Sequence, residues 1–239
     1  MSILPDLKTV LPIELSSLSV GQEATGLIIV DEVNGFVTVG AGNLAPKQPN
    51  AKIDQMVLET NRLAHYWSEQ KWPMLVFLDS HNADHDEPPY PPHCQVGTGE
   101  ENLVSELLWL EQDPQTTLIR KDCINGYIGA SLPDGTNVVL DWLNAYRLKT
   151  VIVMGICTDI CVMDFVLTLL SVRNHKLAPF LKHIAVYEPA CATYDLPMDM
   201  VKKDGLPLTA SHPQDLTHHL GLYFMASRGA ILLNKIEFA

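Results

Sequence analysis

The chain has 239 residues, of which 47% are hydrophobic and 18% charged, so it can form one large domain with an ample core but is short for two. Its 28 acidic and 16 basic residues give a formal net charge of -12, which argues against nucleic acid or an anionic membrane surface as a partner. The most apolar long window, residues 151–170, contains two aspartates, which argues against a membrane span. Five scattered cysteines and no recognisable export signal predict reduced thiols in a cytoplasmic protein.

Short apolar runs rich in β-branched residues alternate along the chain with longer stretches of helical spacing. The runs predict six strands, at residues 25–31, 72–80, 116–121, 150–155, 183–188 and 229–234. The stretches between them predict helices at 48–70, 100–112, 138–148, from about 158 into the 170s, and at 212–226. Continuous apolar strands between helices are typical of a parallel sheet buried on both faces. The sequence therefore predicts a single doubly wound α/β domain over residues 1–239, with a six-stranded, mostly parallel sheet, helices on both faces and an N-terminal extension at 1–24.

Polar side chains follow several of the predicted strands, and in a doubly wound sheet these strand ends lie along the edge where ligands bind. The first strand ends in Asp31, the third ends in Lys121, and Cys161 follows the fourth. Taken singly, each has an ordinary interpretation as a turn residue, a solvated lysine or a packed thiol. If the three meet at one edge, Asp31 could take a proton from the thiol, while Lys121 keeps that carboxylate ionised and stabilises developing negative charge.

The segment TVIVMGICTDICV, residues 150–162, contains two cysteines four residues apart. Thr158 or Asp159 is a good N-cap for the helix that follows the strand. Cys161 would then lie in the first helical turn, where the helix dipole and free N–H groups favour a thiolate. Cys157 would lie just before the cap, where its backbone N–H could face an anion. We therefore interpret Cys161 as the candidate nucleophile.

The loop DSHNADHDEPPYPPHC, residues 79–94, is rich in side chains that bind metals. Its candidate ligands are Asp79, His81, His85, Asp86, Glu87 and His93. Mixed imidazole and carboxylate donors suit zinc, iron or manganese. Phe36 and Tyr90 flank these groups in the sequence and could form an aromatic pocket. The alternative is an ordinary polar surface loop.

Four motifs, LIIVDEVNGF, LDSH with PPHC, IRKDCINGY and VMGICTDICV, occur in one order along the chain. Together they resemble the cysteine hydrolases of the isochorismatase-like superfamily, from about residue 25 to the C-terminus. The version PPHCQVGT is similar to that of nicotinamidases, and the plant type is the most similar group. The presence of Cys161 argues against a true isochorismatase, because those enzymes lack the nucleophilic cysteine.

The resemblance implies that Asp31, Lys121 and Cys161 form a catalytic triad. It also implies an oxyanion hole made by the backbone N–H groups of Cys157 and Cys161, with a cis peptide bond between Ile156 and Cys157. Many relatives have alanine in place of Cys157, so this chain carries an additional oxidisable thiol. We further expect Ile156 to contact the substrate.

For the metal site, the resemblance implies three ligands, Asp79, His81 and His93, and a further one for which Glu87 is preferred over His85. The cofactor would be one divalent metal ion, with zinc preferred and iron or manganese as alternatives. Phe36 and Tyr90 match positions that sandwich a pyridine ring.

The activity implied by the resemblance is hydrolysis of nicotinamide, or a related pyridine carboxamide, to nicotinate and ammonia through a cysteine thioester, in NAD salvage. We expect a small-molecule substrate and a homo-oligomer, with neither nucleic acid nor membrane as partner. The alternatives are another amide or ureido hydrolase of the same superfamily and a non-catalytic metal- or ligand-binding protein with this fold.

Overall fold

The computed structural model describes residues 3–85 and 87–238. A seven-stranded sheet runs through it in the order β1-β7-β6-β5-β2-β3-β4, and each neighbouring pair of strands is parallel. The strands are β1 (Ser16–Val20), β2 (Thr25–Val30), β3 (Met74–Asp79), β4 (Thr116–Lys121), β5 (Thr150–Ile156), β6 (His183–Ala192) and β7 (Ile231–Phe238). Every residue of β2, β3 and β5 is buried, which explains why these strands are apolar without alternation.

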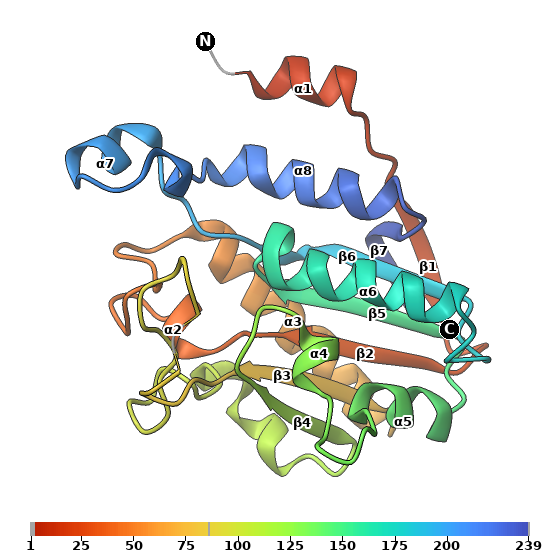
Figure 1. Cartoon of the computed structure of the whole chain (residues 1–239). Helices are drawn as coiled ribbons and strands as arrows, with labels where there is room; N and C mark the ends of the chain where they lie inside the picture. The colour runs from red at the N-terminus through yellow and green to blue at the C-terminus, as the bar shows by residue number, and fades with distance from the viewer. Residues whose placement is uncertain (1–2, 86, 239) are drawn as a thin grey trace.

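Helices cover both faces of the sheet, with α6 and α8 on one side and α3 on the other (Figure 1). The helices are α1 (Leu4–Val10), α2 (Asn34–Val37), α3 (Ala51–Glu69), α4 (Gly126–Gly129), α5 (Val138–Ala145), α6 (Met163–Asn174), α7 (Met198–Lys203) and α8 (Gln214–Ala226). The longest of them, α3, begins where the Asn50 side chain accepts hydrogen bonds from the N–H groups of Lys52 and Ile53. None of the helices in the described ranges is long and apolar enough to cross a membrane.

The doubly wound α/β fold with a parallel sheet is confirmed, but the prediction of six strands is wrong by one. The additional strand, β1, lies within residues 1–24 and pairs with β7 at the edge of the sheet. Its sequence SSLSV is mostly polar, and only Val20 is buried, so it carries no hydrophobic signal. Other elements also differ from the prediction: Ser105–Gln112 forms a 3-10 helix, and β6 continues through Pro189 to Ala192. The short helices α1, α2, α4 and α7 were not predicted.

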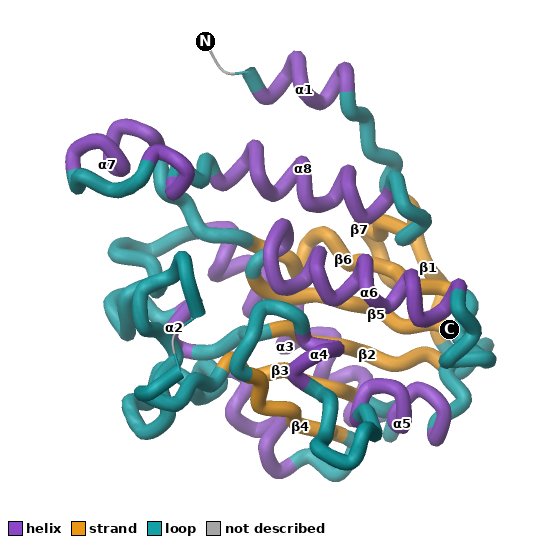
Figure 2. Tube along the Cα trace, viewed as in Figure 1, coloured by secondary structure: helices purple, strands orange, loops and turns teal. Residues whose placement is uncertain are grey.

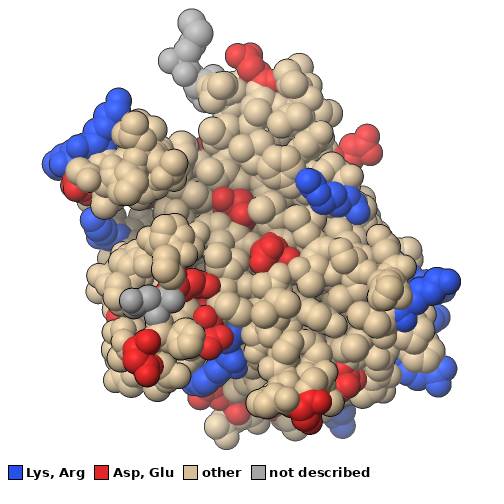
Figure 3. Space-filling model, viewed as in Figure 1, with Lys and Arg blue, Asp and Glu red and all other residues tan. Residues whose placement is uncertain are grey.

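The loops that follow the carboxyl ends of the central strands gather on one side of the molecule, to the left in Figure 2. This is where a parallel doubly wound sheet binds its ligands. On the face shown in Figure 3, acidic side chains lie near the centre, and lysines and arginines stand in scattered groups, mostly towards the margin.

Candidate active site

Asp31, Lys121 and Cys161 come together at the carboxyl ends of the central strands, as the sequence predicts. All three residues are buried. The Lys121 ammonium lies 2.8 Å from Asp31 Oδ2 and 2.8 Å from Asp79 Oδ1, and it also donates to the carbonyl of Cys123 at 3.0 Å. Lys121 therefore joins the triad to the loop that carries the candidate metal ligands, a link that the sequence analysis missed.

The chain turns sharply between β5 and Cys161. Gly155 has φ +123°, and a Cβ added there would lie 2.1 Å from the carbonyl oxygen of Val30, so only glycine fits where β5 passes the end of β2. The Ile156–Cys157 peptide bond is cis, as the resemblance implies. A π-helical turn, Thr158–Val162, then leads into α6, and Cys161 is its fourth residue. The cap residue is Cys157 and not Thr158 or Asp159.

Burial decides the resting protonation states of the triad. It raises the pKa of the Cys161 thiol well above its ordinary value, and the nearby Lys121 ammonium only partly opposes this. This direction is opposite to the expectation that the first helical turn favours a thiolate, because burial is the largest influence on the thiol. Burial also raises the pKa of Asp31 to about 6, again opposed by Lys121. At neutral pH the site holds a neutral thiol next to a mostly ionised carboxylate, which is the arrangement that a general base requires.

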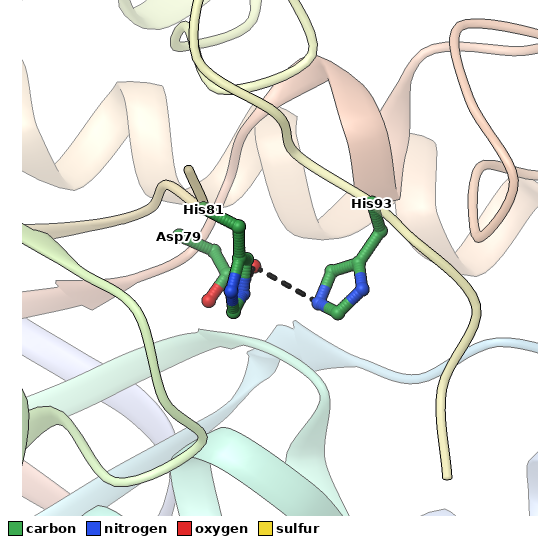
Figure 4. Close-up of side chains that lie close together, drawn as sticks. All are labelled: Asp79, His81 and His93. Carbon is green, nitrogen blue, oxygen red and sulfur yellow. Dashed lines mark hydrogen bonds and ion pairs between the residues drawn. The ribbon is translucent and has the colours of Figure 1, made fainter. Parts of the chain in front are cut away.

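Figure 4 shows a cluster of possible metal-binding atoms, which Lys121 joins to the triad through its contact with Asp79. Asp79, His81 and His93 each offer one donor atom, and these atoms lie within 4.8 Å of one another. Asp79 Oδ2 is 3.0 Å from His81 Nε2 and 3.2 Å from His93 Nε2. Although burial opposes its ionisation, Lys121 and the two histidines hold the pKa of Asp79 below its ordinary value. A buried carboxylate and two imidazoles are a donor set suited to a divalent metal ion, and the residues present fit such an ion.

Glu87 approaches the same cluster, whereas His85 does not belong to it. Glu87 Oε2 lies 3.8 Å from His81 Nε2 and 3.6 Å from His93 Nε2, and its Oε1 accepts a hydrogen bond from the N–H of Ile124. His85 is exposed. Asp86, a further candidate from the sequence, lies outside the described residues. This geometry favours Glu87 as the fourth protein group facing the ion.

Replacing His93 by alanine should remove the metal ion. The variant keeps only two of the three close donors, and a divalent ion that loses one of three protein ligands loses much of its affinity. Metal content per chain, measured by inductively coupled plasma mass spectrometry after dialysis, should fall from about one to a small fraction. His85→Ala changes an exposed histidine in the same loop and should keep full metal content. Equal metal content in the two variants would refute this ligand set.

A cavity of about 490 Å³, counted to its open mouth, extends from the metal donors to the thiol. Its wall includes the three residues that we expected to contact a substrate, Phe36, Tyr90 and Ile156, together with Leu44, Asp79, Glu87, His93, Ile124, Cys157, Ile160, Cys161 and Tyr194. The rings of Phe36 and His93 lie with centroids 5.6 Å apart, so one aromatic wall stands directly beside the metal donors. Most of its wall is apolar or aromatic, and the thiols, the carboxylates and the imidazole are its polar groups, which is typical of a small-molecule site.

Tyr194 is one of four cavity residues that the sequence analysis missed; the others are Leu44, Ile124 and Ile160. Tyr194 follows β6, which the sequence predicts to end at residue 188. The strand instead continues past Pro189, and its end stands beside the end of β5. Reading the run CATY as the continuation of this strand would have placed Tyr194 at the functional edge.

A family model of the isochorismatase domain matches residues 25–199. The chain belongs to the isochorismatase family. Within this family it is 47% identical to Nicotinamidase 1 of Arabidopsis thaliana, over 99% of this chain and 97% of that protein. The resemblance to plant-type nicotinamidases is thereby confirmed.

Solved members of this fold include PnC1 of L. infantum in complex with nicotinate, with a TM-score of 0.66 and 18% identity over 94% of this chain and 100% of that chain. A pyrazinamidase of Pyrococcus horikoshii in complex with zinc has a TM-score of 0.61 and 18% identity over 90% and 98% of the two chains. At such low identity these two structures establish the isochorismatase-like fold alone.

Proposed function

We propose that the chain is a nicotinamidase, which hydrolyses nicotinamide to nicotinate and ammonia in cytoplasmic NAD salvage. The observation that carries this proposal is a cavity lined by the Cys161 thiol and by Asp79 and His93 of the Asp-His-His donor set, with the Asp31–Lys121 ion pair buried behind it. The high identity to a plant nicotinamidase over the full chain supports it.

In the proposed reaction, Asp31 takes the thiol proton as the Cys161 sulfur attacks the amide carbon, and the carbonyl electron pair moves to the oxygen. The backbone N–H groups of Cys157 and Cys161 would stabilise this oxyanion. Collapse of the intermediate breaks the C–N bond, and protonated Asp31 gives its proton to the departing nitrogen, which leaves as ammonia. Asp31 then takes a proton from the water that hydrolyses the thioester and returns it to the sulfur.

The residues at the other end of the cavity would orient the ring. A divalent ion held by Asp79, His81 and His93, with Glu87 nearby, would supply a Lewis-acidic position for the pyridine nitrogen. We propose zinc, because the mixed nitrogen and oxygen donors suit it, with iron or manganese as alternatives. Phe36 and Tyr90 would enclose the ring, and Ile156 would contact it beside the thiol.

Activity should decline in acid as Asp31 becomes protonated. Only the carboxylate can accept the thiol proton, and the folded enzyme holds the pKa of Asp31 at about 6, so the active form is lost as the pH falls through that value. The rate constant kcat/KM should fall about tenfold per pH unit at pH values below this pKa and level off above it. Metal content measured at each pH excludes loss of the ion as the cause. A profile that stays flat down to pH 5 would contradict the role of Asp31.

The direct test is ammonia release from nicotinamide by purified, metal-loaded protein, with nicotinate identified by chromatography. Benzamide is the matched control, because it has the same carboxamide but no ring nitrogen, and it should be a much poorer substrate. A preparation that retains its metal and a reactive Cys161 thiol but releases no ammonia from nicotinamide would reject the proposed function.

A further inference from the structure

Tyr194 lines the same cavity as Cys161 and enters it from the end of β6. It follows β6, whose last residue, Ala192, pairs with Ile156 at the end of β5. In the sheet, β5 separates β6 from β2 and β3, so β6, which leads to Tyr194, and β3, which ends in Asp79, lie on opposite sides of β5. Since Tyr194 and Cys161 line the same cavity, an acyl group on the sulfur would lie between this ring and the metal end.

The Tyr194 ring packs against His212. This buried residue precedes α8 and does not line the cavity. The two rings are stacked, with centroids 3.8 Å apart and planes 13° from parallel. His212 Nδ1 lies 2.9 Å from the carbonyl oxygen of Tyr194, and Nε2 lies 2.8 Å from Asp159 Oδ2. The backbone of His212 is also fixed, by a pair of hydrogen bonds with Leu196. One imidazole thus fixes both the ring and the main chain of the tyrosine.

The same imidazole is connected to the turn that carries the nucleophile. Asp159 lies two residues before Cys161 in that turn, and its backbone packs so closely on Gly221 of α8 that a Cβ there would come within 2.7 Å of the Asp159 Cα. The neighbouring Thr158 hydroxyl lies 2.8 Å from His218 Nδ1. The segment from His212 through α8 therefore contacts both Tyr194 and the turn that carries Cys161, and it fixes their positions relative to each other.

We propose that Tyr194 determines substrate specificity by closing the cavity beside the reacting carboxamide, and that His212 is the positioning residue that fixes its ring relative to Cys161. The inference rests on the proposed function, in which the ring nitrogen lies at the metal end. The Tyr194 ring then faces the edge of the pyridine opposite its nitrogen. It excludes substrates that carry a substituent on that edge, at the ring position next to the carboxamide. Pyridine-3-carboxamide with a methyl group at position 4 is a probe of this exclusion.

The substrate test compares kcat/KM for 4-methylnicotinamide and nicotinamide in Tyr194→Ala, His212→Gln and the double variant. A single methyl group typically changes discrimination between substrates by about tenfold or more. The kcat/KM for 4-methylnicotinamide divided by that for nicotinamide should therefore rise by about that factor in both single variants. The double variant should be no more permissive than Tyr194→Ala, because His212 acts through the tyrosine. Tyr194→Phe, which keeps the ring, should restore the discrimination.

His219→Gln is the matched control for general damage to α8. His219 is equally buried in that helix, and its Nε2 lies 2.9 Å from the carbonyl oxygen of Leu11, away from the cavity. This variant should keep the wild-type ratio. An unchanged ratio in Tyr194→Ala, or effects of Tyr194→Ala and His212→Gln that multiply, would overturn the proposal.

A second measurement needs no substrate and separates the two proposals. Alkylation of Cys161 by N-phenylmaleimide and by iodoacetamide is followed by mass spectrometry, with fragmentation to separate residue 161 from Cys157 on the same peptide. Opening the wall should raise the rate with the bulky reagent relative to the small one, in Tyr194→Ala and His212→Gln but not in His219→Gln. If this rate ratio rises while nicotinamide gives no ammonia, the proposed nicotinamidase function is rejected and the proposed role of Tyr194 is supported. If ammonia is released but neither the substrate ratio nor the alkylation ratio changes, the proposed role of Tyr194 is rejected and the nicotinamidase function is supported.

Discussion

Replacing Cys161 by alanine should reduce turnover of nicotinamide by roughly 10⁴-fold or more, since removal of a covalent nucleophile leaves only the binding and oxyanion contributions. The neighbouring thiol cannot substitute for it. Cys157 lies at the cap, where burial raises the pKa of its thiol to about 12. Its thiol hydrogen-bonds with Thr193 and the backbone of Tyr194, whereas the Cys161 thiol hydrogen-bonds with the Asp31 carboxylate. Steady-state ammonia release measures the effect.

Cys157→Ala is the control for this experiment, and it should retain most of the activity because the proposed oxyanion contact uses its backbone N–H. Trapping the wild-type enzyme with pyridine-3-carbaldehyde should place the adduct on Cys161, as located by fragmentation of the peptide that contains both Cys157 and Cys161. Substantial turnover by Cys161→Ala, or an adduct at residue 157, would reverse the assignment of the two cysteines.

Asp31→Asn and Lys121→Ala should each lower kcat by several orders of magnitude, and the double variant should be little worse than either single one. Groups that act as a unit in one step are strongly non-additive, because once one is absent the other has nothing left to assist. The 2.8 Å contact between Lys121 Nζ and Asp31 Oδ2 is the structural basis for this expectation. Effects that simply multiply would mean that the two residues act separately.

Loss of Lys121 also brings a structural cost that must be distinguished from its effect on catalysis. The ammonium lies between two buried carboxylates, Asp31 and Asp79, and without it their negative charges face each other unscreened. Thermal unfolding and metal content of Lys121→Ala should therefore be measured beside its kinetics. Asp31→Asn removes one of these charges and should be the better folded of the two variants, so it is the cleaner test of the mechanism.

The parts of this structure that the sequence predicts are those with a strong local signal. β2, β3 and β5 are buried throughout, so their apolar runs are unmistakable, and the polar residues that end or follow such runs, Asp31 and Asp79, are placed by the topology alone. The choice of metal ligands in the loop and the roles of the two cysteines could be predicted only with the family resemblance. A polar loop of the same composition can adopt many arrangements, so composition alone does not select the ligands.

What the sequence could not provide depends on contacts between distant segments. The sharing of Lys121 by two carboxylates requires the register of β3 and β4, in which Asp79 pairs with Lys121. The stack of Tyr194 on His212 joins segments on either side of α7. The neutral state of the Cys161 thiol reflects desolvation by the whole fold, which a cap position cannot reveal.

The strand that carried no hydrophobic signal has a consequence for the behaviour of the sheet towards other chains. A free edge of a parallel sheet exposes a row of unpaired N–H and C=O groups that can recruit strands from other molecules and start aggregation. β7, with the sequence ILLNKIEF, would present such an edge next to several apolar side chains. Pairing with β1 covers it and leaves a short, serine-rich border in its place. Because β1 precedes β7 along the chain, this protective strand has already been synthesised when the vulnerable strand emerges from the ribosome.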